Sequence, residues 1–199
     1  MLSQDLLIDH QPQMIFGARS ADPQTLVNNV TALAKLAKVF NLPTVLTSIA
    51  AGTFAGPLIR EITRTFPDIE VIDRSHINAW HDGAFRTAVE ATGRRRLLIV
   101  GLWTEVCLTF PALSATEAGY EVFAVIDASA GSSTAAHDAA IIRMTQKGIV
   151  PVSTASVLSE LQRDWARVET YDAVNEIVVD HMGAWGQGVN YVRAGFARK

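Results

Sequence analysis

Short apolar runs rich in β-branched residues alternate with longer amphipathic stretches along most of the 199-residue chain. The runs have the length of strands, and the stretches between them place apolar residues at helical spacing, as in Leu26, Val30, Leu33 and Leu36. A chain that repeats strand and helix in this order forms a mostly parallel sheet with helices on both faces. We therefore predict an α/β fold, a three-layer doubly wound sheet of about six mostly parallel strands in the order 3-2-1-4-5-6. The expected strands are residues 5–10, 43–48, 69–73, 96–101, 120–129 and 149–154.

The last part of the chain departs from this pattern. From residue 169 onward the alternation stops, and the segment 183–188 is rich in glycine. We predict a domain over residues 1–168 and a C-terminal arm over residues 169–199. The arm either packs on its own domain or crosses to a neighbouring subunit of a homo-oligomer. Its apolar anchors for such a subunit are Trp185, Tyr191 and Phe196.

Composition excludes several classes of partner. The net charge is -3 with both signs scattered, whereas nucleic-acid binding needs a concentrated basic surface. The longest apolar runs fall short of the ~20 residues of a membrane-spanning helix, and the first residues lack the basic start of a signal peptide. The single cysteine cannot form an internal disulfide. We expect a cytoplasmic protein that binds a small molecule, and neither nucleic acid nor membrane.

Two candidate catalytic residues, Asp9 and Cys107, are remote in the chain but close in the predicted sheet. Asp9 ends the first expected strand, and Cys107 follows the fourth. Those strands are neighbours in the expected order, and ligands bind beyond the carboxyl ends of parallel strands where the order reverses. We therefore expect both residues to face one crevice. Taken alone, Asp9 could instead cap a turn.

The segment GLWTEVC places Cys107 in the first turn of the helix after the fourth strand. Free backbone N–H groups and the helix dipole favour a thiolate there, and the same groups could hold an oxyanion. A lone cysteine is also commonly a small buried apolar residue. Its expected place beside Asp9 is what favours a nucleophile.

The loop after the third strand offers further site residues. Arg74 could bring a fixed positive charge that stabilises a thiolate. It could equally form a surface ion pair with Asp73 or Glu70. The candidate pocket-lining residues are Gln11 after the first strand, and His76, Asn78 and Trp80 in this loop.

No sequence signal points to a metal or a cofactor. The histidines lack metal-ligand spacing, and no glycine-rich phosphate motif follows the first strand. We therefore expect a site that works with neither.

Several segments resemble the isochorismatase-like cysteine hydrolases, and most closely the YcaC-like branch of that superfamily. They are LLIDHQ, NLPTVLTS, INAW and GLWTEVCLTFPALSATEAGYEVFAVIDAS. The resemblance implies an Asp–Lys–Cys triad, which falls on Asp9, Arg74 and Cys107, with arginine in place of lysine. It also implies a cis peptide bond, expected at Trp103–Thr104, which would turn the amides of Thr104 and Cys107 toward one oxyanion.

The resemblance further implies the activity. We expect hydrolysis of a small amide-like or related carbonyl compound through a thioester on Cys107, with Asp9 as the base and Arg74 favouring the anion. Nicotinamidases of the superfamily carry an Asp/His metal cluster after the second strand, and here SIAAGTFAGPLIR has no such residue. Two alternatives stay open: vinyl-ether hydrolysis of the isochorismatase type, and a non-catalytic binding or assembly protein that retains the fold. The resemblance also favours a homo-oligomer.

Overall fold

The expected strands form one sheet in the computed structural model, which describes residues 5–196. They are β1 (Asp5–Ile8), β2 (Thr44–Ile49), β3 (Val71–Arg74), β4 (Arg96–Gly101), β5 (Glu121–Val125) and β6 (Val150–Val152). Each neighbouring pair is parallel, in the order β3-β2-β1-β4-β5-β6. The predicted α/β class and strand order are therefore confirmed.

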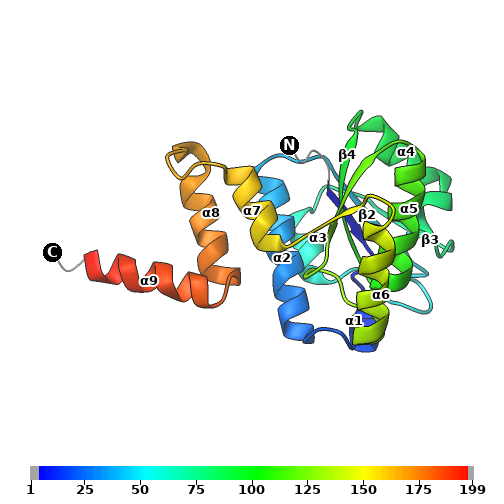
Figure 1. Cartoon of the computed structure of the whole chain (residues 1–199), viewed down its shortest axis with the longest axis horizontal. Coiled ribbons are helices and arrows are strands. Elements are labelled where there is room, and N and C mark those ends of the chain that lie inside the picture. The colour runs from blue at the N-terminus through cyan, green and yellow to red at the C-terminus, as the bar shows by residue number, and fades with distance from the viewer. Residues whose placement is uncertain (1–4, 197–199) are drawn as a thin grey trace.

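Helices connect successive strands and cover both faces of the sheet (Figure 1). They are α1 (Pro12–Gly17), α2 (Pro23–Val39), α3 (Arg60–Thr65), α4 (Gly83–Ala91), α5 (Thr109–Glu117), α6 (Thr134–Thr145), α7 (Thr154–Gln162), α8 (Val168–His181) and α9 (Ala184–Phe196). A 3-10 helix, η1 (Ala79–His81), precedes α4, and a π-helical turn, η2 (Thr104–Leu108), precedes α5. None of the helices in the described range is long and apolar enough to cross a bilayer.

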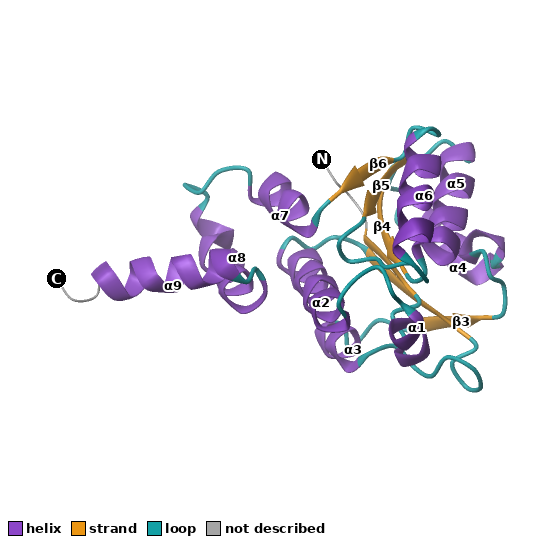
Figure 2. Ribbon diagram, turned by 60° about the horizontal axis from the view of Figure 1, so that its bottom comes forward, coloured by secondary structure: helices purple, strands orange, loops and turns teal. Residues whose placement is uncertain are grey.

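The central strand β4 is buried on both faces, as its unbroken apolar run predicts. Because side chains alternate along a strand, Leu97 and Ile99 pack with α4, α5 and α6. Leu98 and Val100 pack on the other face, against α2, α3 and α7. Figure 2 shows these two helical layers with the sheet between them. The three layers bury the carboxyl ends of the central strands from both sides.

Gly101 ends β4 where the chain crosses closely over β1. A Cβ atom at this position would lie 3.2 Å from the carbonyl oxygen of Cys107 and 3.2 Å from the Cβ of Ile8. Glycine therefore lets η2 fold back tightly over the end of the sheet. This close approach brings the turn that carries Cys107 next to the end of β1.

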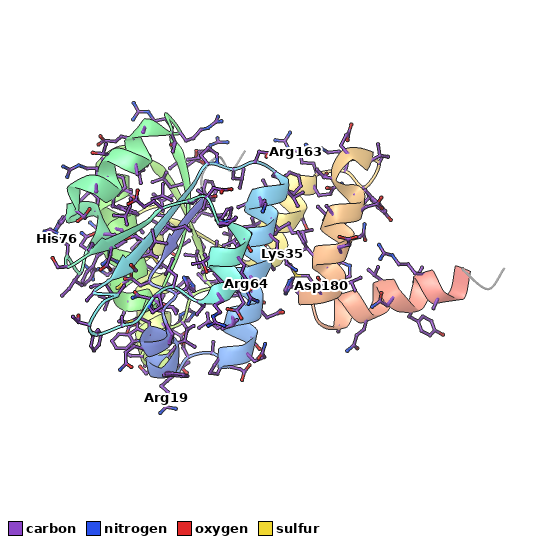
Figure 3. All side chains as sticks on the ribbon, turned by 180° about the vertical axis from the view of Figure 1, so that it is seen from behind. Arg19, Lys35, Arg64, His76, Arg163 and Asp180 are labelled. Atoms are coloured by element: carbon purple, nitrogen blue, oxygen red, sulfur yellow. The ribbon has the colours of Figure 1, made fainter. Side chains whose placement is uncertain are left out.

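The residues after α7 form two helices with different surroundings. Val174, Ile177 and Val178 of α8 are buried in the core that α2 shares, and Lys35 of α2 pairs with Asp180 of α8 at 3.1 Å (Figure 3). Helix α9 leaves the end of α8 and runs away from the sheet (Figures 1 and 2). The arm thus begins by packing on its own chain, while the division at residue 168 stays a prediction.

Candidate active site

Asp9 lies directly after β1, and its side chain is buried. Its backbone N–H donates to the carbonyl oxygen of Thr47 in β2 at 3.1 Å, which continues the sheet by one residue. Its φ angle of 58° lies in the left-handed region, which aspartate adopts more readily than most non-glycine residues. The chain therefore changes direction at the residue predicted to act as the base.

Arg74 ends β3 and reaches across β2 to Asp9. Its Nη2 donates to Asp9 Oδ2 at 2.5 Å, and its Nη1 donates to the carbonyl oxygen of His76 at 2.6 Å. Both side chains of the ion pair have no exposed surface. Arg74 therefore pairs with Asp9 in the site and not with Asp73 at the surface. Asp73 accepts hydrogen bonds from Ser48 and Ala51.

Cys107 lies in η2, and 6% of its surface is exposed. The Cys107 thiol lies so close to the Asp9 carboxylate that each group shifts the pKa of the other. Within the described part of the chain, Asp9 Oδ1 is buried and has no hydrogen-bond partner. The predicted meeting of Asp9 and Cys107 at the ends of adjacent strands is therefore what the structure contains.

Electrostatics favour a protonated thiol in the resting site. Burial, together with the negative charge of Asp9, raises the pKa of the Cys107 thiol, and the Arg74 charge offsets this only in part. Burial also raises the pKa of the Asp9 carboxyl, against the lowering effect of Arg74 and of hydrogen bonds from Cys107 and Arg74. The sequence analysis expects the helix terminus and Arg74 to favour a thiolate. Burial opposes that effect in the resting site, which agrees with the expected transfer of the thiol proton to Asp9.

The backbone before Cys107 differs from the prediction in two ways. The cis peptide bond joins Leu102 and Trp103, one residue earlier than expected. We placed the expected cis bond by aligning the motif with the family pattern. Neither Trp103 nor Thr104 is a proline, so the sequence gives no local sign of which bond is cis. The amide of Thr104 donates to the Ala130 carbonyl at 3.0 Å, and the amide of Cys107 donates to the Trp103 carbonyl at 2.9 Å. The oxyanion prediction required these two amides to converge on one point. They donate to different carbonyl groups instead.

Two of the four predicted pocket residues have their side-chain polar groups bonded within the fold. Gln11 is buried and bonds the backbone of Ile49 and Gly56. Asn78 donates to Ser114 at 3.0 Å and accepts from the Trp80 backbone.

The ring of Trp80 is 7% exposed and makes edge-to-face contacts with Phe85 and Tyr120, so it belongs to the core. His76 is exposed, and its ring lies 3.7 Å from Asp82. The loop after β3 thus orients Arg74 through the His76 carbonyl. The pocket roles expected of Gln11, His76, Asn78 and Trp80 stay predictions.

A second set of polar residues surrounds the site, of which His137 and Glu105 were not among the predicted site residues. His10 Nε2 donates to the Ala128 carbonyl at 2.9 Å, and complete burial lowers the pKa of His10 to about 4. His137 of α6 bonds the Thr104 hydroxyl at 2.8 Å, and Glu105 accepts from the Ser132 backbone and hydroxyl. These contacts fix η2 against the start of α6. His10 in the LLIDHQ segment and Glu105 in the TEVC motif carried a sequence signal, whereas His137 carried none.

No group of three or more His, Cys, Asp or Glu side chains among residues 5–196 has the arrangement of a metal site. The chemistry that the described side chains offer is a buried thiol beside a carboxylate, which is itself fixed by a guanidinium. Such a set can transfer the thiol proton and expose sulfur as a nucleophile.

Comparison with known proteins places the chain among isochorismatase domains. Residues 5–156 match the family model described as the isochorismatase domain. The chain is 45% identical over 161 residues to "Probable hydrolase YcaC" of Escherichia coli K12, which covers 80% of this chain and 77% of that protein.

Two solved structures have nearly the same fold. The crystal structure of the Escherichia coli YcaC gene product, described as an octameric hydrolase of unknown specificity, matches with a TM-score of 0.92 and 39% identity. YcaC from Pseudomonas aeruginosa, solved with hexane-2,5-diol and covalent acrylamide, matches with a TM-score of 0.91 and 39% identity. Each match covers 96% of this chain and 94% of the other chain.

Proposed function

Because the chain belongs to the isochorismatase family and to its YcaC-like branch, we propose that this hydrolase uses Cys107 as a nucleophile on a small amide-like carbonyl compound. The observation that carries the proposal is the state of the Asp9 carboxylate. One oxygen, Oδ2, is held by Arg74, while Oδ1 is buried and has no hydrogen-bond partner among the described residues. A fixed carboxylate with one unused oxygen is a proton acceptor suited to a buried thiol.

The reaction begins with the thiol proton moving to Asp9 as sulfur attacks the carbonyl carbon. The S–C bond forms, and the proton held by Asp9 passes to the leaving nitrogen as the C–N bond breaks. Water then gives a proton to Asp9 while its oxygen attacks the thioester carbon. The C–S bond breaks, the proton held by Asp9 returns to sulfur, and the carboxylic acid leaves. In this sequence the thiolate exists only during attack, which agrees with a resting thiol of raised pKa.

We assign the oxyanion contact to the Cys107 amide alone. The Trp103 carbonyl accepts from the amides of Val106, Cys107 and Leu108. If the Cys107 amide turns to a substrate oxygen, that carbonyl keeps two donors, so the change leaves no buried group unpaired. The Thr104 amide has no such alternative, because it is the donor to Ala130.

Arg74 acts on Asp9 rather than as a proton carrier. A guanidinium keeps its charge and its fork geometry, so it can fix the carboxylate but cannot exchange a proton with it. Its charge is balanced by Asp9 within the same buried pair. The site therefore offers no excess positive charge, which favours a small uncharged amide over a dicarboxylate such as isochorismate.

The relatives support two further parts of the proposal. Acrylamide is a small amide and a thiol-reactive electrophile, and the Pseudomonas aeruginosa protein holds it covalently. The Escherichia coli protein is octameric. We propose that this chain is likewise a homo-oligomer and that small amides reach its cysteine.

A panel of small primary amides, with ammonia release as the readout, tests the proposal against a Cys107→Ala control. We expect release by the wild type and none by the variant, with both proteins equally folded by circular dichroism. Turnover that persists in Cys107→Ala would reject the thioester route. Pyruvate release from isochorismate in the absence of amide turnover would favour vinyl-ether hydrolysis instead.

A further inference from the structure

The backbone of Trp103 holds the turn that carries the nucleophile. Trp103 is the N-cap residue of η2. Its carbonyl oxygen accepts from the amides of Val106, Cys107 and Leu108 at 3.0, 2.9 and 3.3 Å. The position of this carbonyl therefore sets where the turn, and the sulfur on it, lies over the end of the sheet.

The side chain of Trp103 reaches a different element, helix α1. Its indole Nε1 donates to the carbonyl oxygen of Met14 at 3.0 Å. The backbone N–H of Ala18, which would close a helical turn on Met14, donates to the Ile15 carbonyl at 3.1 Å instead. The indole thus supplies a donor to Met14 at a helix end, where carbonyl groups lose their partners within the helix.

Gly17, the last residue of α1, lies directly against this indole. A Cβ atom at Gly17 would lie 2.5 Å from Cζ2 of Trp103, a separation that packed side chains do not adopt. Gly17 is not among the described glycines with a positive φ angle, so its backbone conformation does not call for glycine. Glycine is also a poorer helix former than alanine. The close contact with the indole is therefore what calls for glycine at this position.

Helix α1 directly extends the segment that holds the proposed base. Gln11 is the N-cap residue of α1, and its amide donates to the Asp9 carbonyl oxygen at 2.8 Å. The Gln11 side chain bonds the backbone of Ile49 in β2, which fixes the start of the helix. Because α1 has only six residues, a displacement at Gly17 has little length over which to be absorbed before it reaches Asp9.

We propose that Trp103 is a positioning residue, whose indole and its contact with Gly17 set the approach of the Cys107 thiol to Asp9. At one end of this link is the carbonyl that holds the Cys107 amide, and at the other is the helix that follows Asp9. Proton transfer and attack depend steeply on such alignment. The inference rests on the proposed function, because it concerns the same thiol and carboxylate.

A double-mutant cycle on the rate of acrylamide addition to Cys107, followed by intact mass, tests the contact itself. Acrylamide adds to the thiol without a leaving group, so the rate reports on the nucleophile whether or not the protein cleaves amides. Gly17→Ala places a methyl group against Cζ2, whereas Trp103→Phe removes that atom and the indole donor. Phe16→Ala is the matched control, since its ring is 75% exposed beside Gly17.

We expect Gly17→Ala and Trp103→Phe each to slow the addition by about 10-fold, and Phe16→Ala to react at the wild-type rate. In the Trp103→Phe background, Gly17→Ala should change the rate by less than about 2-fold, because the indole is absent. An equal loss from Gly17→Ala in both backgrounds, or an unchanged rate in Trp103→Phe, would overturn the proposal. A faster reaction of Gly17→Ala would also overturn it. Since Cys107 is only 6% exposed, a site that is merely loosened exposes the thiol and speeds its modification.

A graded series at Gly17 keeps the test decisive if Trp103→Phe does not fold by circular dichroism. Alanine and then valine should slow the addition progressively, and equal rates in the three proteins would overturn the proposal. With an amide that the wild type hydrolyses, Gly17→Ala should lower kcat and leave KM within about 2-fold, whereas a change in KM alone would contradict a positioning role.

The acrylamide rates also separate this inference from the proposed hydrolysis. The expected rates without any amide turnover would reject the hydrolysis and leave the positioning role in place. A wild type that acrylamide does not modify at Cys107 would reject both.

Discussion

The carboxyl edge of the sheet and helix α9 differ in how far their side chains are buried within one chain. At the edge, Asp9, Arg74 and Cys107 come from the ends of three strands, and the first two have no exposed surface. In α9 most side chains are exposed, although Gly186 packs on α8 and the Trp185 ring contacts the Trp165 ring edge to face. The comparison teaches that the site is completed by its own fold, whereas most of α9 stays exposed in a single chain.

The largest expected effect is on amide turnover, when Cys107, the proposed nucleophile, is replaced. Cys107→Ser keeps the shape of the side chain but replaces sulfur by a poorer nucleophile, so amide turnover should fall by about 10³-fold or more. The thermal midpoint should change little, because the site would remain packed. Comparable turnover in the two proteins would show that Cys107 is only a buried apolar residue.

The two ion pairs near these regions should differ strongly in their contribution to stability. Arg74→Met leaves the buried Asp9 charge unpaired and should lower the free energy of unfolding by about 3–5 kcal/mol. Lys35→Met removes the half-exposed pair between α2 and α8 and should cost at most about 1 kcal/mol. Urea unfolding measures both. Equal losses would contradict the claim that Asp9 and Arg74 form a dry, internally completed pair.

The buried His10 should make stability depend on pH. Its folded pKa of about 4 lies below the unfolded value of 6.5, so the unfolded chain binds the proton more tightly. Stability from the neutral ring is therefore full above pH 6.5 and is lost as pH falls from 6.5 to about 4, by about 3 kcal/mol in total. His10→Asn should remove this loss. Since Asp9 is present in both proteins, its opposite contribution cancels in their difference.

The smallest effect is expected on the arm. Tyr191→Ala removes a ring that is 83% exposed, so the free energy of unfolding should change by less than about 0.5 kcal/mol. Thermal unfolding at matched concentrations measures it. A loss of several kcal/mol would mean that α9 is packed more firmly than its exposed surface indicates.

The sequence was sufficient for the parts of the fold that depend on periodicity. The alternation of β and α elements predicted a parallel sheet, and the doubly wound strand order assumed for that sheet brought Asp9 to Cys107 across almost a hundred residues. Helix α9 was missed as a regular element because its glycines weaken the helical pattern. The short helix α1 was also missed, since it contains only six residues.

Details of the site were harder to predict because they depend on burial and on backbone geometry. The direction of the Cys107 pKa shift follows from desolvation, which a motif does not reveal. Gln11 and Trp80 have residue types suited to a pocket, yet the fold uses Gln11 to join two loops and Trp80 to fill the core. The position of the cis bond before Trp103 has no local sequence signal.

The central claim, that Asp9 takes the proton from Cys107, is tested most directly by the rate of acrylamide addition to Cys107, followed by intact mass. Asp9→Asn is compared with Asp73→Asn, which removes a nearby negative charge that bears on the pKa of Asp9. If Asp9 is the base, its variant should react about 10²-fold more slowly than the wild type, and the Asp73 variant should not. If Asp9 only opposes the thiolate through its charge, Asp9→Asn would react as fast as the wild type or faster, and the account would be wrong.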